Sequence, residues 1–376
     1  MRALFWISAG LLAWAQVGYG VFLAAVRALT GSVPAERLGA ARPRVSLIVA
    51  AYREEAVIAA KVANALALDW PRDRLEIVVA IDGGADPDAD ATAARARAAG
   101  ADQVLELPRH GKYHAQDAAV AAATGELLAF SDANAMWEPD ALRELAAAFA
   151  DPDVGYACGQ VRFVNEEGTN QEGLYWRYEM WLRRNESALA SVTAGNGAIY
   201  AVRPADYLPA DVLLGHDLAF PFQLVKRGRR AVYVPGARAV EKMVPTVEGE
   251  WARKRRMMSH AWPIVLRGGL LDPRGYGALY ALMMLSHRLL RYTAPLLHVV
   301  LALTTLALLP RGRVYAAAAA SQAAVLAAAA AGGRVRSRPL LVARYYVLTT
   351  ASLAAGLYDW LRYGAEVGWE PAEGTR

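Results

Sequence analysis

Two aspartates stand where short apolar runs end. Asp82 follows the run 75–81, and Asp132 follows the run 126–130, with Asn134 two residues further on. A carboxylate placed directly after a strand can bind a hard divalent cation that also holds a diphosphate. Either aspartate alone could instead be a turn or helix-cap residue, because Asp favours both places. Their matched positions after two strands favour a nucleotide-sugar site.

Two further residues are suited to phosphate contact and proton transfer. Lys112 follows a glycine just before the helical stretch 114–123, and a lysine at a helix start can meet a phosphate or a sugar. The glycine spacing and the Ser or Thr of a P-loop are absent. Asp217, directly after His216, could deprotonate a sugar hydroxyl as a general base. A helix-capping role for Asp217 and a structural role for His216 are the alternatives.

The run Arg253-Lys-Arg-Arg256 is dense in positive charge. One of its arginines could stabilise a departing diphosphate by charge-assisted hydrogen bonds. A membrane-contacting basic face is the alternative. The single cysteine, Cys158, excludes an intrachain disulfide and a Cys-cluster metal site. A small buried apolar residue is its expected role.

The elements that must position these residues read as an α/β fold. Apolar runs at 45–50, 75–81, 103–107 and 126–130 alternate with Ala-rich helical stretches at 56–68, 89–99 and 114–123. Strands buried on both faces and alternating with helices predict a parallel sheet of βαβ units. Ligands bind such sheets at the carboxyl ends of the strands. The polar residues gather at those ends: Tyr52, Glu54, Asp82, Asp132 and Asn134.

The composition indicates that part of the surface faces lipid. Hydrophobic residues make up 55% of the 376 residues and charged residues only 20%, and the mean hydropathy is +0.17. The formal net charge is +5. The arginines concentrate beside apolar segments rather than in one long tract, which favours a membrane surface or a phosphorylated substrate over nucleic acid.

The apolar segments predict a membrane protein with a cytoplasmic catalytic domain. Residues 3–26 carry no charge and are long enough to span a bilayer, so we expect an anchor; a cleaved signal peptide is the alternative. Arginines after it place the next domain in the cytoplasm by the positive-inside rule, at the inner (plasma) membrane. The expected domains are an anchor (1–28), a catalytic domain (42–250), interfacial amphipathic helices broken by Pro263 and by glycines (251–292), about three transmembrane helices (293–360) and a tail (361–376).

The motifs in this order resemble glycosyltransferase family 2, particularly its membrane-bound branch related to cellulose and hyaluronan synthases. The matching segments are 45–55 (opening strand and nucleotide-binding turn), Asp82-Gly-Gly (uracil-side aspartate motif), Gly111-Lys112 with Ala115 (Gly-Gly-Lys motif), Asp132-Ala-Asn134 (Asp-x-Asp metal motif), Gly215-His-Asp217 (Glu-Asp base motif) and Arg253-Lys-Arg-Arg256 (Gln-x-x-Arg-Trp motif).

Several residues depart from the family pattern. Asn134 replaces the second metal carboxylate, and His216 replaces Glu. Arg253 and Met257 stand where the family has Gln and Trp, and Arg256 is retained. In the synthases that tryptophan stacks on the acceptor sugar. Its loss argues against a long-polymer synthase and favours transfer of a single sugar to a lipid-linked or short acceptor.

The resemblance implies a GT-A (Rossmann-like) domain and inverting transfer from an NDP-sugar, with UDP expected. It implies Mg2+ or Mn2+ on Asp132, and membrane lipids as the surroundings. The implied site residues are Asp217 and Arg256 (catalytic), Ala51, Tyr52, Glu54, Asp82, Lys112, Asp132 and Asn134 (donor), and Gly195, Asn196, His216 and Trp262 (acceptor). One alternative is a catalytically silent membrane scaffold that binds nucleotide or lipid. Another is a nucleotidyltransferase, but the usual Gly-rich phosphate loop is missing.

Overall fold

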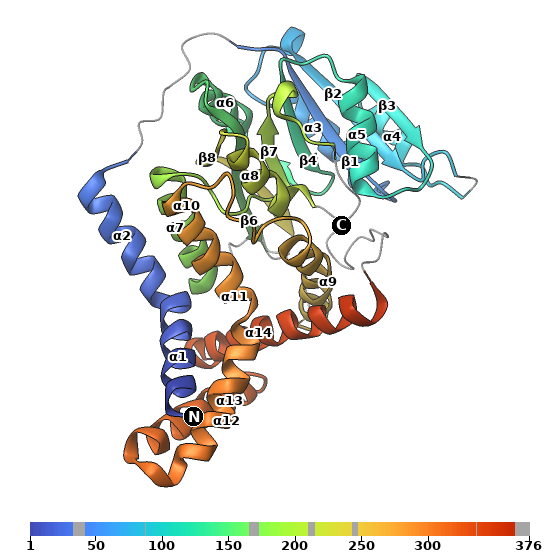
Figure 1. Ribbon diagram of the computed structural model, residues 1–376. Helices are drawn as coiled ribbons and strands as arrows, with labels where there is room; N and C mark the ends of the chain where they lie inside the picture. Colours follow the sequence, from blue (N-terminus) through green and yellow to red (C-terminus); the bar gives the residue numbers. More distant parts are fainter. Residues whose placement is uncertain are drawn as a thin grey trace.

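A computed structural model describes residues 1–32, 42–86, 88–164, 173–209, 215–242, 247–335 and 337–364. Residues 365–376 of the expected tail lie outside these ranges. Figure 1 shows a sheet domain at one end and a group of long helices at the other. The sheet has eight strands in the order β3-β2-β1-β4-β7-β6-β8-β5.

The first four strands form the parallel part of this sheet, as predicted. They are β1 (Val45–Ala51), β2 (Leu75–Asp82), β3 (Gln103–Leu107) and β4 (Leu127–Asp132), and β1 pairs in parallel with both β2 and β4. The helices between them are α3 (Ile58–Leu66), α4 (Thr92–Ala98) and α5 (Lys112–Ala122). Every residue of β1 is buried, because helices cover both faces of the sheet.

The second half of the sheet makes it mixed. Its strands are β5 (Met136–Trp137), β6 (Val154–Val164), β7 (Ile199–Val202) and β8 (Arg230–Lys242), and β7 is antiparallel to both β4 and β6. The helices here are α6 (Ala141–Ala147), α7 (Leu174–Leu189) and α8 (His216–Lys226). The sequence did not predict the strands of this half. Helices separate them, but β5 has only two residues and β7 runs antiparallel to its neighbours, so they do not repeat the βαβ pattern of the first half.

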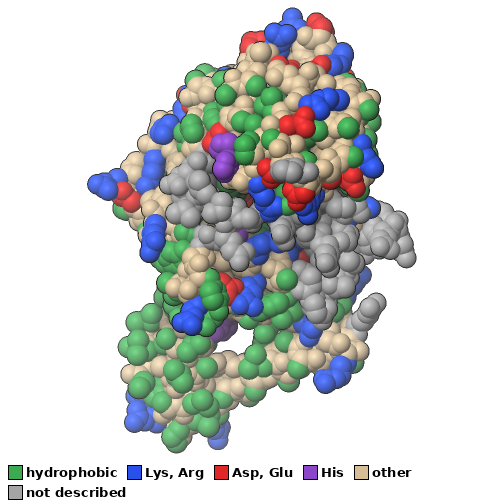
Figure 2. Space-filling model, turned by 90° about the vertical axis from the view of Figure 1, so that its right-hand side faces the viewer, with side chains coloured by type: hydrophobic (Ala, Val, Ile, Leu, Met, Phe, Trp, Pro, Cys, Tyr) green, Lys and Arg blue, Asp and Glu red, His purple; other side chains and the backbone are tan. Residues whose placement is uncertain are grey.

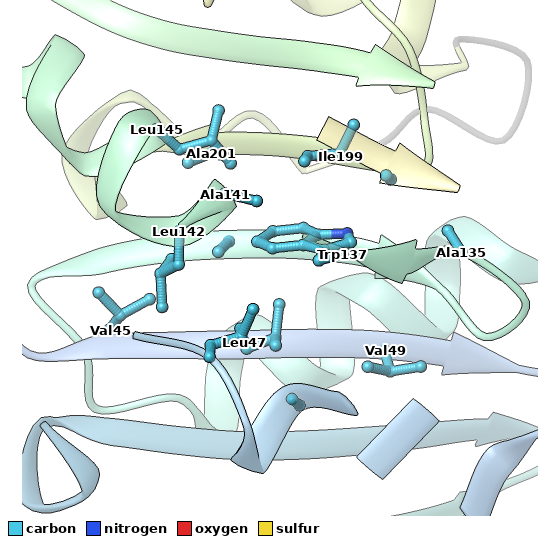
Figure 3. Close-up of a cluster of buried hydrophobic side chains, with 14 of the residues drawn as sticks. Val45, Leu47, Val49, Ala135, Trp137, Ala141, Leu142, Leu145, Ile199 and Ala201 are labelled. Atoms are coloured by element: carbon cyan, nitrogen blue, oxygen red, sulfur yellow. The ribbon is translucent and has the colours of Figure 1, made fainter. Parts of the chain in front are cut away.

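One hydrophobic core lies on the α3 and α6 side of the sheet. Leu47 and Val49 of β1 point into it, Trp137 fills its centre and Leu142 of α6 closes it (Figure 3). The Trp137 indole N–H donates to the carbonyl of Ala198 at 3.1 Å, so the ring is satisfied as well as buried. This core fixes the loop that follows β4.

Within the part of the chain that the structure describes, four helices are long and apolar enough to cross a membrane: Arg2–Thr30, Ala294–Arg311, Arg313–Ala331 and Arg338–Tyr363. The first comprises α1 (Arg2–Ala13), a π-helical turn (Trp14–Gly18) and α2 (Tyr19–Thr30), and the others contain α12 (Ala294–Leu308), α13 (Arg313–Ala331) and α14 (Arg338–Tyr363). Figure 2 shows hydrophobic side chains gathered over this end of the molecule. In Figure 1, α14 runs across beneath the sheet domain, whereas α1 and α2 run along the side.

The basic segment 251–292 was expected to form short, broken helices. In the structure, its first part belongs to one long helix that ends at Leu266. The elements of this segment are α9 (Val247–Leu266), α10 (Ala278–Met283), a second π-helical turn (Met284–Leu289) and α11 (Leu290–Tyr292). Pro263 lies inside α9 instead of ending it, and the helix continues to Leu266 although proline has no N–H for the helix ladder. The Pro263 carbonyl accepts from Arg267 N at 2.8 Å. Gly269, with φ of 81°, follows the end of the helix.

Candidate active site

The register of the sheet brings the ends of β1, β2 and β4 together. Ala50 of β1 lies opposite Ala80 of β2 on one side and Asp132 of β4 on the other. Asp82 and Asp132 are the last residues of their strands. We call this edge of the sheet, with Asp82, Lys112 and Asp132, the donor edge.

Asp82 is buried with half of its carboxylate bonded. Its Oδ1 accepts from the backbone N–H groups of His110 at 2.7 Å and Gly111 at 2.9 Å. Its Oδ2 is buried and has no hydrogen-bond partner among the residues that the structure describes. A buried acceptor without a partner is costly, so this oxygen is well suited to a ligand N–H.

A cavity of about 140 Å³ opens beside Asp82. Tyr52 and Arg109 line it, with the Arg109 guanidinium 3.7 Å from the centre of the Tyr52 ring. Arg53, also in its wall, adopts a φ of 50° that non-glycine residues rarely take. A ring and a stacked guanidinium together present flat surfaces to a planar ligand. The strained backbone of Arg53, in a turn that lines this cavity, is typical of binding sites.

Asp132 and Lys112 form an ion pair at the middle of the donor edge. Lys112 Nζ donates to Asp132 Oδ1, and the two side chains are 15% and 24% exposed. Lys112 begins α5, and Gly111 before it has a φ of 96°. Asn134 is half-buried in the turn after β4. No group of three or more His, Cys, Asp or Glu side chains within the described ranges is placed to hold a metal.

Helix α3 supports this turn from behind. The fully buried Lys61 donates from Nζ to the carbonyl of Ala135 at 2.6 Å, and its Nζ lies 5.2 Å from the centre of the Trp137 ring. Asn64 exchanges two hydrogen bonds with the Trp137 backbone. Burial lowers the pKa of Lys61 to about 7, although the charges of Asp132 and Glu241 oppose the shift.

Asp217 lies in the first turn of α8, with Tyr113 beside it. Its Oδ1 accepts from Leu218 N at 3.0 Å and its carbonyl accepts from Gly195 N at 2.7 Å. A Cβ built on Gly215 would lie 2.6 Å from Tyr113 Oη and 3.2 Å from Asp217 Oδ1. Burial, and then the charges of Asp217 and Asp132, raise the pKa of Tyr113 well above its ordinary value. The Tyr113 hydroxyl is therefore close enough to both carboxylates to be affected by their charges.

His216 is buried and neutral. Its Nδ1 lies 3.0 Å from Tyr200 Oη, and burial, with the charge of Lys112 second, lowers its pKa to about 3. His216 is therefore uncharged beside Asp217. A structural role, the alternative that the sequence left open, matches these contacts.

The predicted acceptor residues Gly195 and Asn196 belong to a tightly held segment. A Cβ on Gly195 would lie 1.8 Å from Tyr156 Oη, so only glycine fits there. Asn196 donates to the Gly159 carbonyl at 2.6 Å and accepts from Ile199 N at 2.9 Å. Both bonds fix the backbone, and they use one of the two N–H donors and one of the two oxygen lone pairs of the amide.

Two predicted site residues, Trp262 and Arg256, lie on α9, and two others, Ala51 and Glu54, lie at and just after the end of β1. Trp262 is 3% exposed, and its indole N–H donates to the Leu353 carbonyl at 2.9 Å, so its ring offers no face to an acceptor. Arg256 is half-buried on α9, and no ion pair joins it to a described residue. Ala51 is buried at the end of β1, and Glu54 is buried with its carbonyl accepting from Ile58 N at the start of α3.

Known proteins resemble this chain in sequence and in fold. A model of Glycosyl transferase family 2 matches residues 46–206, and one of Glycosyl transferase family group 2 matches residues 128–332, which is more than half of the chain. Over 96% of this chain and 99% of the other, the fold matches the mannosyltransferase PcManGT from Pyrobaculum calidifontis, solved in complex with GDP-Man and Mn2+, with a TM-score of 0.74 and 24% identity.

Curated relatives point the same way. An N-acetylglucosaminyltransferase of Rhizobium leguminosarum bv. viciae is 26% identical over 57% of this chain and 54% of its own length, and one of Azorhizobium caulinodans is 29% identical over 52% and 54%. The chain spans about half the length of the curated relatives that it matches. The sheet domain is a GT-A fold, and the chain belongs to glycosyltransferase family 2.

Proposed function

We propose that this chain is a membrane-bound inverting glycosyltransferase that transfers a sugar from an NDP-sugar to a lipid-linked or saccharide acceptor. One observation carries the proposal: residues 110–113 touch each part of the site in turn. Gly111 N donates to Asp82, Lys112 pairs with Asp132, and Tyr113 lies beside Asp217. Nucleotide, diphosphate and acceptor would then follow one another along a single continuous segment.

The nucleotide base would enter the cavity beside Asp82. The unpartnered Oδ2 of Asp82 would accept a ring N–H, while Tyr52 and Arg109 would cover the face of the ring. Uracil carries such an N–H at the edge of its ring, and guanine does too, so either base satisfies this acceptor. We keep UDP as the expected nucleotide. The names of the curated relatives make UDP-N-acetylglucosamine the first donor to test, with GDP-mannose, the ligand of the structural neighbour, as the second.

A divalent cation would be held by Asp132, with Mg2+ and Mn2+ both suitable. Asp132 already faces a cation, the ammonium of Lys112, so its carboxylate is suited to a positive partner. Because no cluster of ligating side chains occurs within the described ranges, the ion would take its remaining ligands from the diphosphate and water. Bound there, it would neutralise charge on the leaving diphosphate. Lys112 would then be released to contact the donor phosphates.

Asp217 would act as the general base. The acceptor oxygen attacks the anomeric carbon, its proton passes to Asp217, and the bond from that carbon to the diphosphate breaks, so the nucleoside diphosphate leaves. A single in-line displacement inverts the carbon and converts an α-linked donor into a β-glycoside. Arg256, if a movement of α9 brought it to the site, would stabilise the leaving group.

The helices support a membrane site with the sheet domain on the cytoplasmic side. We propose that Arg2–Thr30 and the α12–α13 pair cross the bilayer, and that α14 lies along the surface beneath the sheet domain. Asp359 of α14 is paired with Arg255 of α9. A helix lying in the interface can hold such a pair in water on one face while its apolar face contacts lipid.

The decisive test is Asp217→Asn, which keeps the shape of the side chain but removes the base. With purified protein in lipid nanodiscs and labelled NDP-sugar, we expect transfer to fall about 10²–10⁴-fold. Nucleotide affinity should stay within about twofold of wild type, since Asp217 does not contact the donor base. Near-normal transfer by this variant would overturn the base assignment. Absence of any NDP release by the wild-type protein, with every donor and lipid extract tried, would favour the silent scaffold instead.

A further inference from the structure

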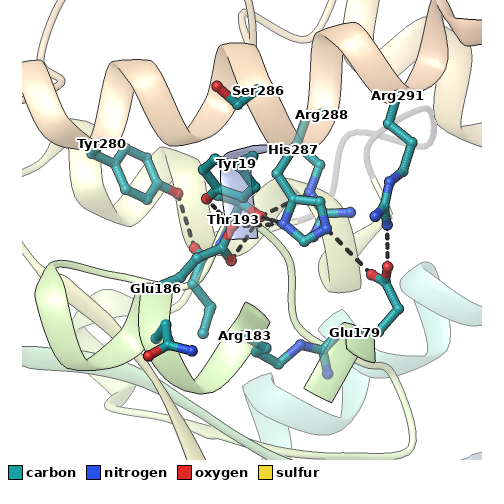
Figure 4. Close-up of polar contacts among 12 residues, drawn as sticks. Tyr19, Glu179, Arg183, Glu186, Thr193, Tyr280, Ser286, His287, Arg288 and Arg291 are labelled. Carbon is teal, nitrogen blue, oxygen red and sulfur yellow. Dashed lines mark hydrogen bonds and ion pairs between the residues drawn. The ribbon is translucent and has the colours of Figure 1, made fainter. Parts of the chain in front are cut away.

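Two π-helical turns lie side by side where the N-terminal helix meets the helices after α9. One is Trp14–Gly18 and the other is Met284–Leu289. They are joined by a hydrogen bond from Trp14 Nε1 to Ser286 Oγ, 2.9 Å long. A π-turn widens the helix by one residue, and such turns are concentrated at functional sites. Beside these two turns, the side chains of Tyr19, His287 and Arg288 lie close together (Figure 4).

These side chains converge on Glu186 of α7, which is fully buried. Tyr19 Oη donates to its carboxylate at 2.6 Å, and His287 Nδ1 lies 2.6 Å from the same oxygen. Thr193 donates from Oγ1 at 3.1 Å and from its backbone N–H at 3.3 Å. We call Tyr19, Glu186, Thr193, His287 and Arg288 the buried junction.

The junction is charged in spite of its burial. Burial raises the pKa of Glu186, but the charge of His287, its hydrogen bond and the charge of Arg288 outweigh burial, so the pKa falls below its ordinary value. A buried carboxylate is tolerated only when each of its oxygens is bonded. With four contacts on one carboxylate, the geometry of the junction is closely fixed.

Thr193 connects the junction to the active site. Its Oγ1 accepts from Arg288 Nε at 2.9 Å while it donates to Glu186. Two residues later, Gly195 N donates to the Asp217 carbonyl at 2.7 Å. Figure 4 shows Thr193 in the middle of this group, between Glu186 and His287.

The same segment reaches the donor edge at its other end. A Cβ built on Gly197 would lie 3.6 Å from Lys112 Nζ. Residues 193–197 therefore touch the junction, the base and the donor lysine in turn. The close fit of Gly195 against Tyr156 leaves this segment no room to slide. A displacement at Thr193 would reach Asp217 and Lys112.

We propose that Thr193 is a positioning residue for glycosyl transfer, and that the buried junction makes the N-terminal helix part of the catalytic unit. The junction holds Thr193, and segment 193–197 sets Asp217 against the donor. This inference rests on the proposed function, because it requires Asp217 to act as the base. A misplacement of about 1 Å in a reacting group costs about 10²-fold in rate, so modest loosening has a large effect.

Thr193→Val tests this, because valine keeps the shape and loses the hydroxyl. We expect kcat for transfer to fall about 10–100-fold, with KM for the NDP-sugar and nucleotide affinity within about twofold of wild type. Thr193→Ser should restore most of kcat, since serine keeps both hydrogen bonds. Thr304→Val is the matched control, because Thr304 is equally buried but bonds only within α12. It should leave kcat unchanged.

Tyr19→Phe tests the membrane end of the same path. It removes only the hydroxyl that donates to Glu186, so we expect a smaller fall in kcat of about 3–10-fold, again without loss of nucleotide affinity. The inference is overturned if Thr193→Val keeps the wild-type kcat, or if it loses kcat and nucleotide affinity equally. It is also overturned if Thr193→Ser does not restore kcat. Asp217→Asn separates the two proposals. Normal transfer by this variant would refute the assignment of Asp217 as the base. An inactive Asp217→Asn together with a fully active Thr193→Val would refute only the positioning role of Thr193.

Discussion

The donor edge and the buried junction use similar residues under opposite conditions. At the donor edge, Asp82 keeps one carboxylate oxygen unpartnered and Asp132 is 24% exposed beside a lysine. At the junction, Glu186 is fully buried, and three other side chains bond to its carboxylate. The first arrangement leaves carboxylate oxygen available to a ligand, and the second leaves none.

The difference follows from where each group lies in the fold. Parallel strands end together, so residues at their carboxyl ends face outward from an otherwise rigid sheet. The junction instead lies between four segments, α2, α7, the loop before β7 and the second π-turn. An unpaired charge there would cost several kcal/mol, so every group must be satisfied within the protein. The donor edge is therefore expected to govern activity and the junction to govern stability and geometry.

Asp132→Asn should show the largest effect and should act on activity alone. An amide binds a divalent cation weakly, so we expect transfer to fall about 10³-fold, or about 4 kcal/mol in the activation barrier. The free energy of unfolding should change by less than about 1 kcal/mol, because the Lys112 pair is partly exposed. Metal-dependent transfer and urea unfolding in detergent measure the two quantities.

Asp69→Asn is the control for that variant, since Asp69 is an exposed carboxylate paired with Arg143. It should change neither quantity. A loss of stability in Asp132→Asn as large as its loss of activity would show that the donor edge is also a structural site, and the division between the two regions would fail.

Glu186→Gln should lower the stability of the protein, in contrast to Asp132→Asn. The amide cannot accept every bond that the carboxylate accepts, and it removes a negative charge beside the buried His287 and the half-buried Arg288. We expect the free energy of unfolding to fall by about 3 kcal/mol. Glu106→Gln, which weakens a partly exposed pair with Arg97, should cost less than about 1 kcal/mol. Equal costs for the two variants would mean that burial does not set the difference.

The donor edge could be predicted from the sequence because it depends on local patterns. Runs of buried strand residues ended by Asp82 and Asp132 predict the sheet and also the edge at which we propose that the donor binds. Arg109 and Tyr113 were missed, although they flank the predicted Lys112. An arginine and a tyrosine in a loop and a helix start carry no periodic signal, and only the fold shows what they face.

The junction could not be predicted, because its contacts join distant residues. Trp14 and Ser286 are 272 positions apart, and the π-turns that align them leave no mark in an apolar sequence. The structure also differs from the expectation for Trp262, and again the reason is a contact between distant residues. A tryptophan after a basic run resembles an acceptor platform, but packing of α9 against α14 buries it.

His216 lies beside Asp217 of the proposed site, yet it is buried like the residues of the buried junction. Its folded-state pKa of about 3 lies below the ordinary 6.5, so the unfolded chain binds a proton that the folded chain does not. Its contribution to stability is therefore present above about pH 6.5 and is lost as the pH falls from there toward 3. We expect His216→Gln to reduce the loss of unfolding free energy between pH 8 and pH 5 by up to about 2 kcal/mol. Urea unfolding at the two pH values measures this, and His114→Gln, at an exposed histidine, should leave the difference unchanged. An unchanged difference in His216→Gln would mean that the histidine is accessible to protons in the folded protein. The proposed base Asp217 would then stand on a more open helix start than the packing of α8 implies.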